Sequence, residues 1–162
     1  MRTSAMIGHR LLQAMAIAVL VVSSATAAAS STQVLGYLAD QHVAAFERSA
    51  GSTEARRSAA RACRAATRNG KAVPLGVPGA ARSRGTFEWL SGHPRSALRW
   101  WGRSLDASER IGMPYQIALT EFDFGRLSGD RVRLEHAAVV FADLGAELDG
   151  ARANEALSLV SA

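Results

Sequence analysis

The side chains that could take part in catalysis or metal binding are few in this chain of 162 residues, and they stand far apart. The histidines are His9, His42, His93 and His136. None of them has a second potential ligand three or four residues away, the spacing at which two side chains share a helix face. The histidines therefore predict no metal site.

Glu121 and Asp123 come closest to a carboxylate pair. Two residues apart on a helix, their side chains diverge by roughly 200° and cannot share a proton. We expect both to face water, with Phe122 buried between them. Cys63 is the only cysteine, which excludes an internal disulfide, and its alanine neighbours predict a buried, unreactive thiol. Phosphate-loop and protein-kinase signatures are missing from the sequence. We interpret the chain as non-enzymatic, with no catalytic residue, cofactor or metal.

The net charge of +5 is unevenly distributed along the chain. Residues 1–80 contain nine basic and three acidic side chains, whereas residues 81–162 contain ten and eleven. All the basic residues except Lys71 are arginines. A basic N-terminal half could attract nucleic acid or an anionic membrane. We favour a simpler interpretation, in which arginines such as Arg57, Arg61, Arg64 and Arg68 form the solvent side of a helix.

Residues 1–31 are open to two interpretations, and we treat them as separate from the domain at 32–162. A short basic start, the apolar run from Leu11 to Val22 and the small residues Ala25 to Ala27 have the layout of a secretory signal peptide. The apolar run is too short to span a bilayer. The same residues also have the periodicity of a buried helix over about 9–23.

The rest of the chain has helical periodicity throughout, which predicts an all-α fold. Glycine and proline divide it, and the segment 71–80 contains so many of them that we expect a loop there. No segment alternates polar and apolar residues as a strand would. With the N-terminal helix counted and a short last helix left out, we expect about seven helices. After residue 31 they lie at 32–48, 53–69, 80–90, 95–111, 115–127 and 131–144, and the short last one lies at 150–159.

One unit of sequence occurs twice. Gly85, Ala97 and Trp101 recur forty residues later as Gly125, Ala137 and Phe141. Small residues allow two helices to approach closely, and an aromatic ring one turn later fills the space beside them. We expect these six residues and Phe122 to form the core of two antiparallel helix hairpins.

This unit resembles the tetratricopeptide repeat, in which the same glycine, alanine and aromatic positions recur. Gly92 would supply the glycine of the first turn between helices. The period of forty exceeds the usual thirty-four, and the Trp, Leu and Tyr positions of the signature are not matched. The resemblance implies a solenoid of helix hairpins.

A wider resemblance covers residues 35–153 and is strongest over 78–145. The segments 61–64, 78–85, 92–105 and 111–118 are similar to the C-terminal helical tails of large bacterial signalling proteins, which join a kinase or nucleotide cyclase to a P-loop ATPase. In that family the tail is a sensor or a platform for protein docking. The resemblance implies a cytoplasmic piece of such a tail and favours the buried helix over the signal peptide. An exported helical protein and an arginine-rich nucleic-acid binder remain the alternatives.

Such a module would bind another protein, or the neighbouring repeats of a longer chain, rather than nucleic acid or a membrane. Trp89 and Trp100 are candidates to line its groove as anchors for a bound peptide. The apolar segments at 11–22 and 156–160 would have no covering repeat. We therefore expect the full chain to self-associate and a chain trimmed to 32–152 to do so less.

Overall fold

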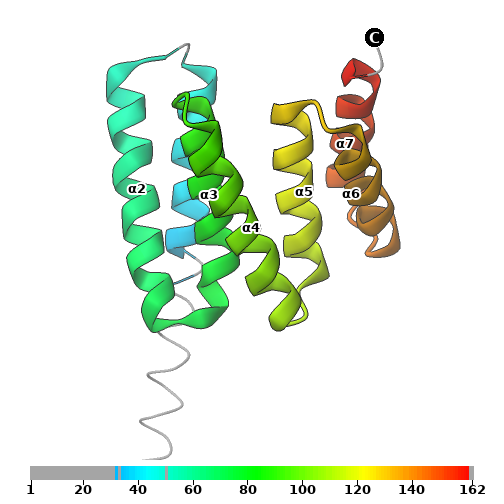
Figure 1. Cartoon of the computed structure of the whole chain (residues 1–162), viewed down its shortest axis with the longest axis horizontal. Helices are drawn as coiled ribbons and strands as arrows, with labels where there is room; N and C mark the ends of the chain where they lie inside the picture. The colour runs from blue at the N-terminus through cyan, green and yellow to red at the C-terminus, as the bar shows by residue number, and fades with distance from the viewer. Residues whose placement is uncertain (1–31, 33, 50, 161–162) are drawn as a thin grey trace, which may run out of the picture.

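The computed structural model describes residues 32, 34–49 and 51–160, and within these residues all regular structure is helical (Figure 1). The all-α prediction is confirmed. A first described helix covers 34–48. It is followed by α2 (Thr53–Ala72), the single 3₁₀ turn η1 (Pro74–Gly76), α3 (Val77–Leu90), α4 (Pro94–Arg110), α5 (Pro114–Ser128), α6 (Arg131–Asp143) and α7 (Glu147–Val160). The predicted helix over 9–23 and the signal-like segment lie outside the described residues.

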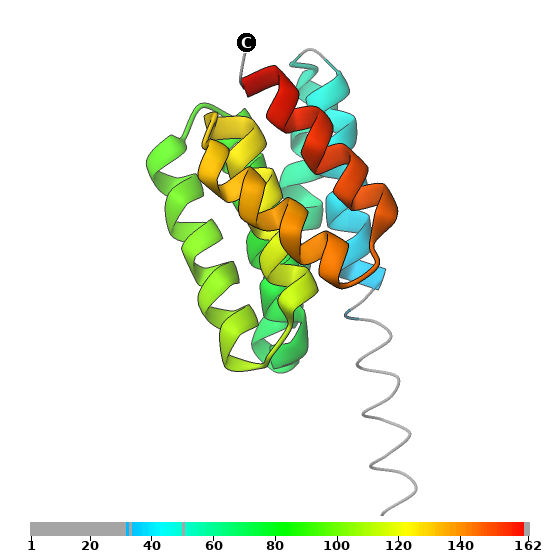
Figure 2. The same ribbon diagram turned by 90° about the vertical axis from the view of Figure 1, so that its right-hand side faces the viewer.

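Neighbouring helices pack as antiparallel hairpins, and the hairpins pack side by side. Each helix from α3 to α6 contacts the next one, and α3 also contacts α5, as α5 contacts α7. Every second helix therefore lies on the same side of the molecule. The first described helix, α3, α5 and α7 form one side, and α2, α4 and α6 form the other (Figures 1 and 2).

The predicted loop over 71–80 is wrong. Helix α2 continues to Ala72, and α3 already begins at Val77, so only the short turn η1 separates them. Pro78 stands in the first turn of α3. A proline is tolerated there because the backbone N–H groups of a first helical turn have no partner within the helix. The density of prolines and glycines was therefore a signal for a helix start as well as for a turn.

The last helix is longer than the prediction of 150–159. Helix α7 begins at Glu147, and its first turn contains the carboxylates of Glu147 and Asp149. Negative charge in this place is stabilised by the positive end of the helix dipole. Gly150 lies within the helix rather than at its start.

The side chain of Trp101 lies at the centre of the hairpin formed by α3 and α4. It is fully buried, and so is Ala97 one turn earlier. A Cβ atom built on Gly85 would stand only 2.4 Å from Cδ1 of Trp101, so the indole occupies the space that a glycine leaves free. The Trp101 ring lies 5.6 Å from the Trp89 ring of α3 and stacks at 4.8 Å on the Phe124 ring of α5. Trp101 thus joins three helices.

The second copy of the unit packs differently. Ala137 and Phe141 are fully buried, but Phe141 contacts the rings of Tyr115 and Phe122 rather than the glycine of its own hairpin. A Cβ atom on Gly125 would instead stand 2.8 Å from Cγ of Leu134. The equivalent glycines therefore make room for different side chains, an indole in one hairpin and a leucine in the other.

We predict that Trp101→Ala lowers the free energy of unfolding by about 3–5 kcal/mol, because it leaves a large cavity between three helices. Trp100→Ala is the matched control. Trp100 is only half-buried, so its removal should cost about 1 kcal/mol. Chemical denaturation of both variants measures the difference, and equal losses would contradict the central position of Trp101.

A second prediction compares two helical glycines. Gly85→Ala should destabilise the protein by about 1–3 kcal/mol, because the new methyl group collides with Trp101. Gly102→Ala should stabilise it by up to about 1 kcal/mol, since a methyl group on Gly102 would meet no atom within 4 Å and alanine is the better helix former. Thermal unfolding that shows the same sign of change for both variants would refute the packing at Gly85.

Candidate binding groove

A groove of about 920 Å³ runs along the side formed by the first described helix, α3, α5 and α7. These four helices supply all of the residues that line it. A second, smaller cavity of about 270 Å³ lies between the first described helix and α2. The alternation of helices thus brings segments from both ends of the described chain to one site.

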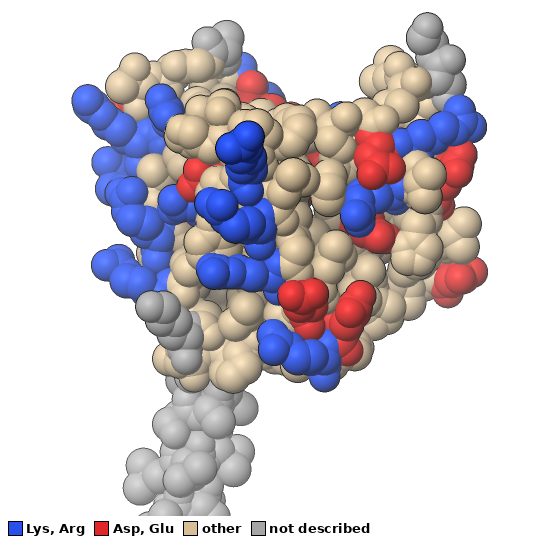
Figure 3. All heavy atoms as spheres, viewed as in Figure 1, with Lys and Arg blue, Asp and Glu red and all other residues tan. Residues whose placement is uncertain are grey.

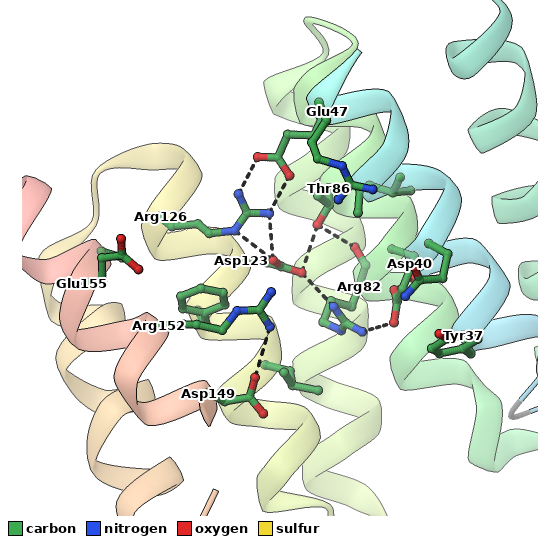
Figure 4. A pocket seen from close by; sticks show the side chains of 18 of the residues that line it. Tyr37, Asp40, Glu47, Arg82, Thr86, Asp123, Arg126, Asp149, Arg152 and Glu155 are labelled. Atoms are coloured by element: carbon green, nitrogen blue, oxygen red, sulfur yellow. Dashed lines mark hydrogen bonds and ion pairs between the residues drawn. The ribbon is translucent and has the colours of Figure 1, made fainter. Parts of the chain in front are cut away.

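Five charged side chains form a continuous chain of ion pairs along the floor of the groove (Figure 4). We call them the ion ladder: Asp40, Arg82, Asp123, Arg126 and Glu47. Arg82 on α3 donates to Asp40 at 2.5 Å and to Asp123 at 2.8 Å. Arg126 donates to Asp123 at 3.1 Å and to Glu47 at 2.6 Å. Because Asp40 and Glu47 both belong to the first described helix, the ladder begins and ends on the same element.

The ladder is largely removed from water at its centre. The side chains of Arg82 and Asp123 are 12% and 10% exposed, whereas the terminal carboxylates are about one-third exposed. Burial by itself would lower the pKa of Arg82, but the carboxylates of Asp40 and Asp123 outweigh it and raise that pKa above its ordinary value. The same balance raises the pKa of Arg126 beside Glu47 and Asp123. Both guanidinium groups are therefore charged at neutral pH.

Hydrogen bonds connect the ladder to the core. Thr86 donates from Oγ1 to the Asp123 carboxylate at 3.3 Å, and the Trp101 indole N–H donates to the same hydroxyl oxygen at 3.4 Å. Ser83 donates to Asp40. The floor of the groove is thus continuous with the aromatic core beneath it, and its charged groups are held in place from both sides.

The open part of the groove is apolar and aromatic. Tyr37 on the first described helix is 64% exposed, and Leu159 on α7 is 75% exposed. Tyr115 is 41% exposed and donates its hydroxyl to Asp149 at 2.7 Å. Partial burial and this hydrogen bond raise the pKa of Tyr115, so its hydroxyl stays protonated. The groove therefore combines a floor of mutually paired charges with exposed apolar side chains above it.

The expectation that Asp123 faces water is wrong. Asp123 is only 7% exposed and lies at the centre of the ladder. Glu121 diverges from it as expected, but its side chain is only 14% exposed and contacts His136 and Arg133 on α6. Phe122 is half-buried; it packs against Phe141 and also lines the groove. Two neighbouring carboxylates thus have different partners on different helices.

Neither Trp89 nor Trp100 lines the groove. Trp89 packs against Trp101, and Trp100 lies on the outer side, where the guanidinium group of Arg103 stands 4.8 Å from its ring. The prediction that these two tryptophans anchor a bound peptide therefore does not apply to this groove. The tyrosines take the exposed positions, because their hydroxyl groups can reach polar partners or water.

The remaining candidate residues are separate from the groove and from one another. His42 contacts Ser58, and His93 contacts Glu88 at 3.1 Å. Cys63 is fully buried, and burial raises the pKa of its thiol to about 12. Within the described residues, no three His, Cys, Asp or Glu side chains stand close enough to hold a metal ion.

The sequence does contain a signal for the ladder. Asp40 and Glu47 are seven residues apart and lie on the same helix face as the buried Val43. Asp123 and Arg126 are three residues apart, which also places them on one face. Charged residues on the inner stripe of a predicted helix indicate buried ion pairs. The sequence does not show which of them pair.

Comparison with protein-family models, with curated proteins and with solved structures finds no match to this chain. None of the helices in the described part is both long and apolar enough to cross a lipid bilayer. Function must therefore be inferred from the residues of the chain itself.

We predict that Asp123→Ala destabilises the fold by about 3–5 kcal/mol, because Arg82 and Arg126 lose a shared, buried counter-charge. Asp143→Ala is the control, since Asp143 is exposed and makes no ion pair with another described residue; its loss should change stability by less than about 0.5 kcal/mol. Urea unfolding at low and high salt would measure both. A small effect of Asp123→Ala, or one that salt abolishes, would show that the ladder is a surface feature.

Proposed function

We propose that this chain is a non-catalytic helical-repeat module that binds a segment of a partner protein in the groove. The supporting observation is the position of the groove. It runs along one side of the molecule, where the first described helix, α3, α5 and α7 all line it, so it offers one continuous surface to an extended or helical segment. Grooves of this kind bind protein segments through apolar anchors placed in pockets. Tyr37, Tyr115 and Leu159 provide exposed apolar surface of the required kind.

The ion ladder favours recognition over chemistry. A catalytic carboxylate or other general base must be able to exchange a proton, and it must be accessible to a substrate. Asp123 instead accepts from two guanidinium groups and one hydroxyl, and no histidine or cysteine lines the groove. Because the charges of the floor are already paired with one another, few of these side chains have to be reordered when a partner binds, which lowers the free-energy cost of binding.

The resemblance to bacterial signalling tails agrees with this function, and we propose that the chain is a piece of such a tail, acting in the cytoplasm. The repeat unit and its glycine, alanine and aromatic positions support the tetratricopeptide assignment. Self-association of the full chain remains a prediction of this proposal. The rival proposal of an exported helical protein depends on residues 1–27, and N-terminal sequencing of the expressed protein distinguishes the two.

Random twelve-residue peptides displayed on phage and selected against the full chain provide a test. Peptides that bind the groove should lose at least about tenfold in affinity when Tyr37 and Leu159 are replaced by Ala, because such anchors contribute about 1–2 kcal/mol or more each. The matched control is Val132→Ala with Val139→Ala on α6, two exposed apolar residues outside the groove. The groove proposal fails if no peptide is enriched, or if both double variants weaken binding equally.

A further inference from the structure

The arginines of the described residues differ in their ion pairs according to the helix on which they lie. Every arginine of α3, α5, α6 and α7 pairs with a carboxylate: Arg82, Arg84, Arg126, Arg131, Arg133 and Arg152. The nine arginines of α2 and α4 are all exposed, and none of them forms an ion pair with another described residue. All the described arginines without an ion pair therefore lie on these two helices, except Arg48 on the first described helix.

On α2 four of the five arginines form a row along the helix. Arg57, Arg61, Arg64 and Arg68 follow one another at intervals of four, three and four residues, which keeps them on one helix face. At 1.5 Å per residue, the row is about 16 Å long.

Helix α4 has a second row. Arg95, Arg99 and Arg103 follow at intervals of four residues over about 12 Å. After Arg103 the next charged residues of α4 are the acidic Asp106 and Glu109, so the row ends there. We call the seven residues of the two rows the arginine face.

Both rows lie on the side of the molecule opposite the groove. Figure 3 shows basic side chains gathered over α2 and over α4 in a single view. Acidic side chains are fewer in this part of the view: some lie between the two groups and at the upper edge, and others lie near the lower end of α4 and farther toward α6 and α7. Helix α3 packs against both α2 and α4 and separates the two rows. The arginine face thus consists of two rows of guanidinium groups, one on α2 and one on α4, with α3 between the two helices.

Apart from the contact of Arg103 with the Trp100 ring, the arginine face makes no ion pair or ring contact with another described residue that would stabilise the fold. The inward sides of α2 and α4 supply the core, through residues such as Cys63, Ala97 and Trp101. The arginines project the other way, and seven like charges without counter-charges repel one another. This repulsion lowers the stability of the fold, and an anion bound from outside would offset it.

We propose that the arginine face binds the phosphate backbone of a double-stranded nucleic acid. A guanidinium group matches a phosphate with two parallel hydrogen bonds. Two rows on two helices suit a ligand that presents two rows of phosphates, as a duplex does on either side of a groove. Such binding contacts the phosphates and not the base edges, so it does not depend on the nucleotide sequence.

Two features of the face disfavour other polyanions. A helix that lies on a membrane buries an apolar side in the lipid, but Leu98 is the only large apolar residue of α2 or α4 that is exposed. Single-stranded nucleic acid is held by stacking of bases on free aromatic rings. The ring of Trp100 is covered by Arg103 and Arg84.

Fluorescence anisotropy with a mixed-sequence 20-base-pair DNA duplex, and separately with a 20-base-pair RNA duplex, tests this proposal on the full chain. Seven phosphate contacts predict a slope of about −6 in a plot of log affinity against log salt concentration. Affinity should therefore fall about 10³–10⁴-fold between 50 and 200 mM salt. Binding of either duplex with this dependence supports the proposal, and the two arms identify which one is preferred.

Two triple variants with the same change in net charge separate the arginine face from general attraction. Arg95→Gln, Arg99→Gln and Arg103→Gln together should make the slope shallower by about 2.7. The second triple variant replaces three arginines outside the arginine face: Arg48→Gln, Arg131→Gln and Arg152→Gln. It should leave the slope within about one unit of the wild-type value. Circular dichroism and melting would check that both variants fold.

Several outcomes would overturn the proposal. These are equal weakening by the two triple variants, no duplex binding at 50 mM salt, or a single-stranded 20-mer bound as tightly as a duplex. Binding to phosphatidylserine-containing vesicles without duplex binding would assign the face to a membrane. The Tyr37→Ala, Leu159→Ala double variant should bind duplexes normally, so this test is independent of the groove.

Discussion

The buried carboxylate of Asp123 is the constraint on which the arrangement of the helices depends. It accepts from Arg82 on α3, from Arg126 one turn later on its own helix and from the hydroxyl of Thr86. An unpaired carboxylate in this place would cost several kcal/mol, so α3 and α5 must meet in the register that supplies its partners. The ladder then ends on Asp40 and Glu47, which are seven residues apart on a single helix. What it contributes is a defined register more than net stability, because desolvation offsets much of the attraction between buried charges.

Packing of aromatic rings on small residues supports the same register from the core side. Trp101 fills the space beside Gly85, stacks on Phe124 of the next hairpin and donates through Thr86 toward Asp123. A shift of α4 against α3 would therefore disturb the core and the floor of the groove together. The packing of the core and the ion pairs of the groove floor are therefore coupled through Thr86.

Arginine has two different uses in this chain. In the floor of the groove the charges of Arg82 and Arg126 are neutralised by carboxylates, and these arginines join helices to one another. On the side of α2 and α4 arginine is left unpaired, and the charge is available to a ligand. The opposite faces of the molecule thus differ in chemistry although they are built from the same residue type, and the two proposed functions can be tested on separate sets of residues.

The sequence by itself determined the helices, most of their boundaries and the all-α class, because periodicity, glycine and proline act over a few residues. The prediction from sequence was wrong at 71–80, where we expected a loop but α3 begins at Val77 with Pro78 in its first turn. It also showed that Gly85 and Gly125 are equivalent in spacing, but not that one makes room for Trp101 and the other for Leu134. Only the tertiary structure decided that Asp123 is buried rather than solvated, and that tyrosines rather than tryptophans line the groove. The physical reason is distance along the chain: the partner of each charge lies on another hairpin, as Glu47 does for Arg126, and its identity depends on how the hairpins pack.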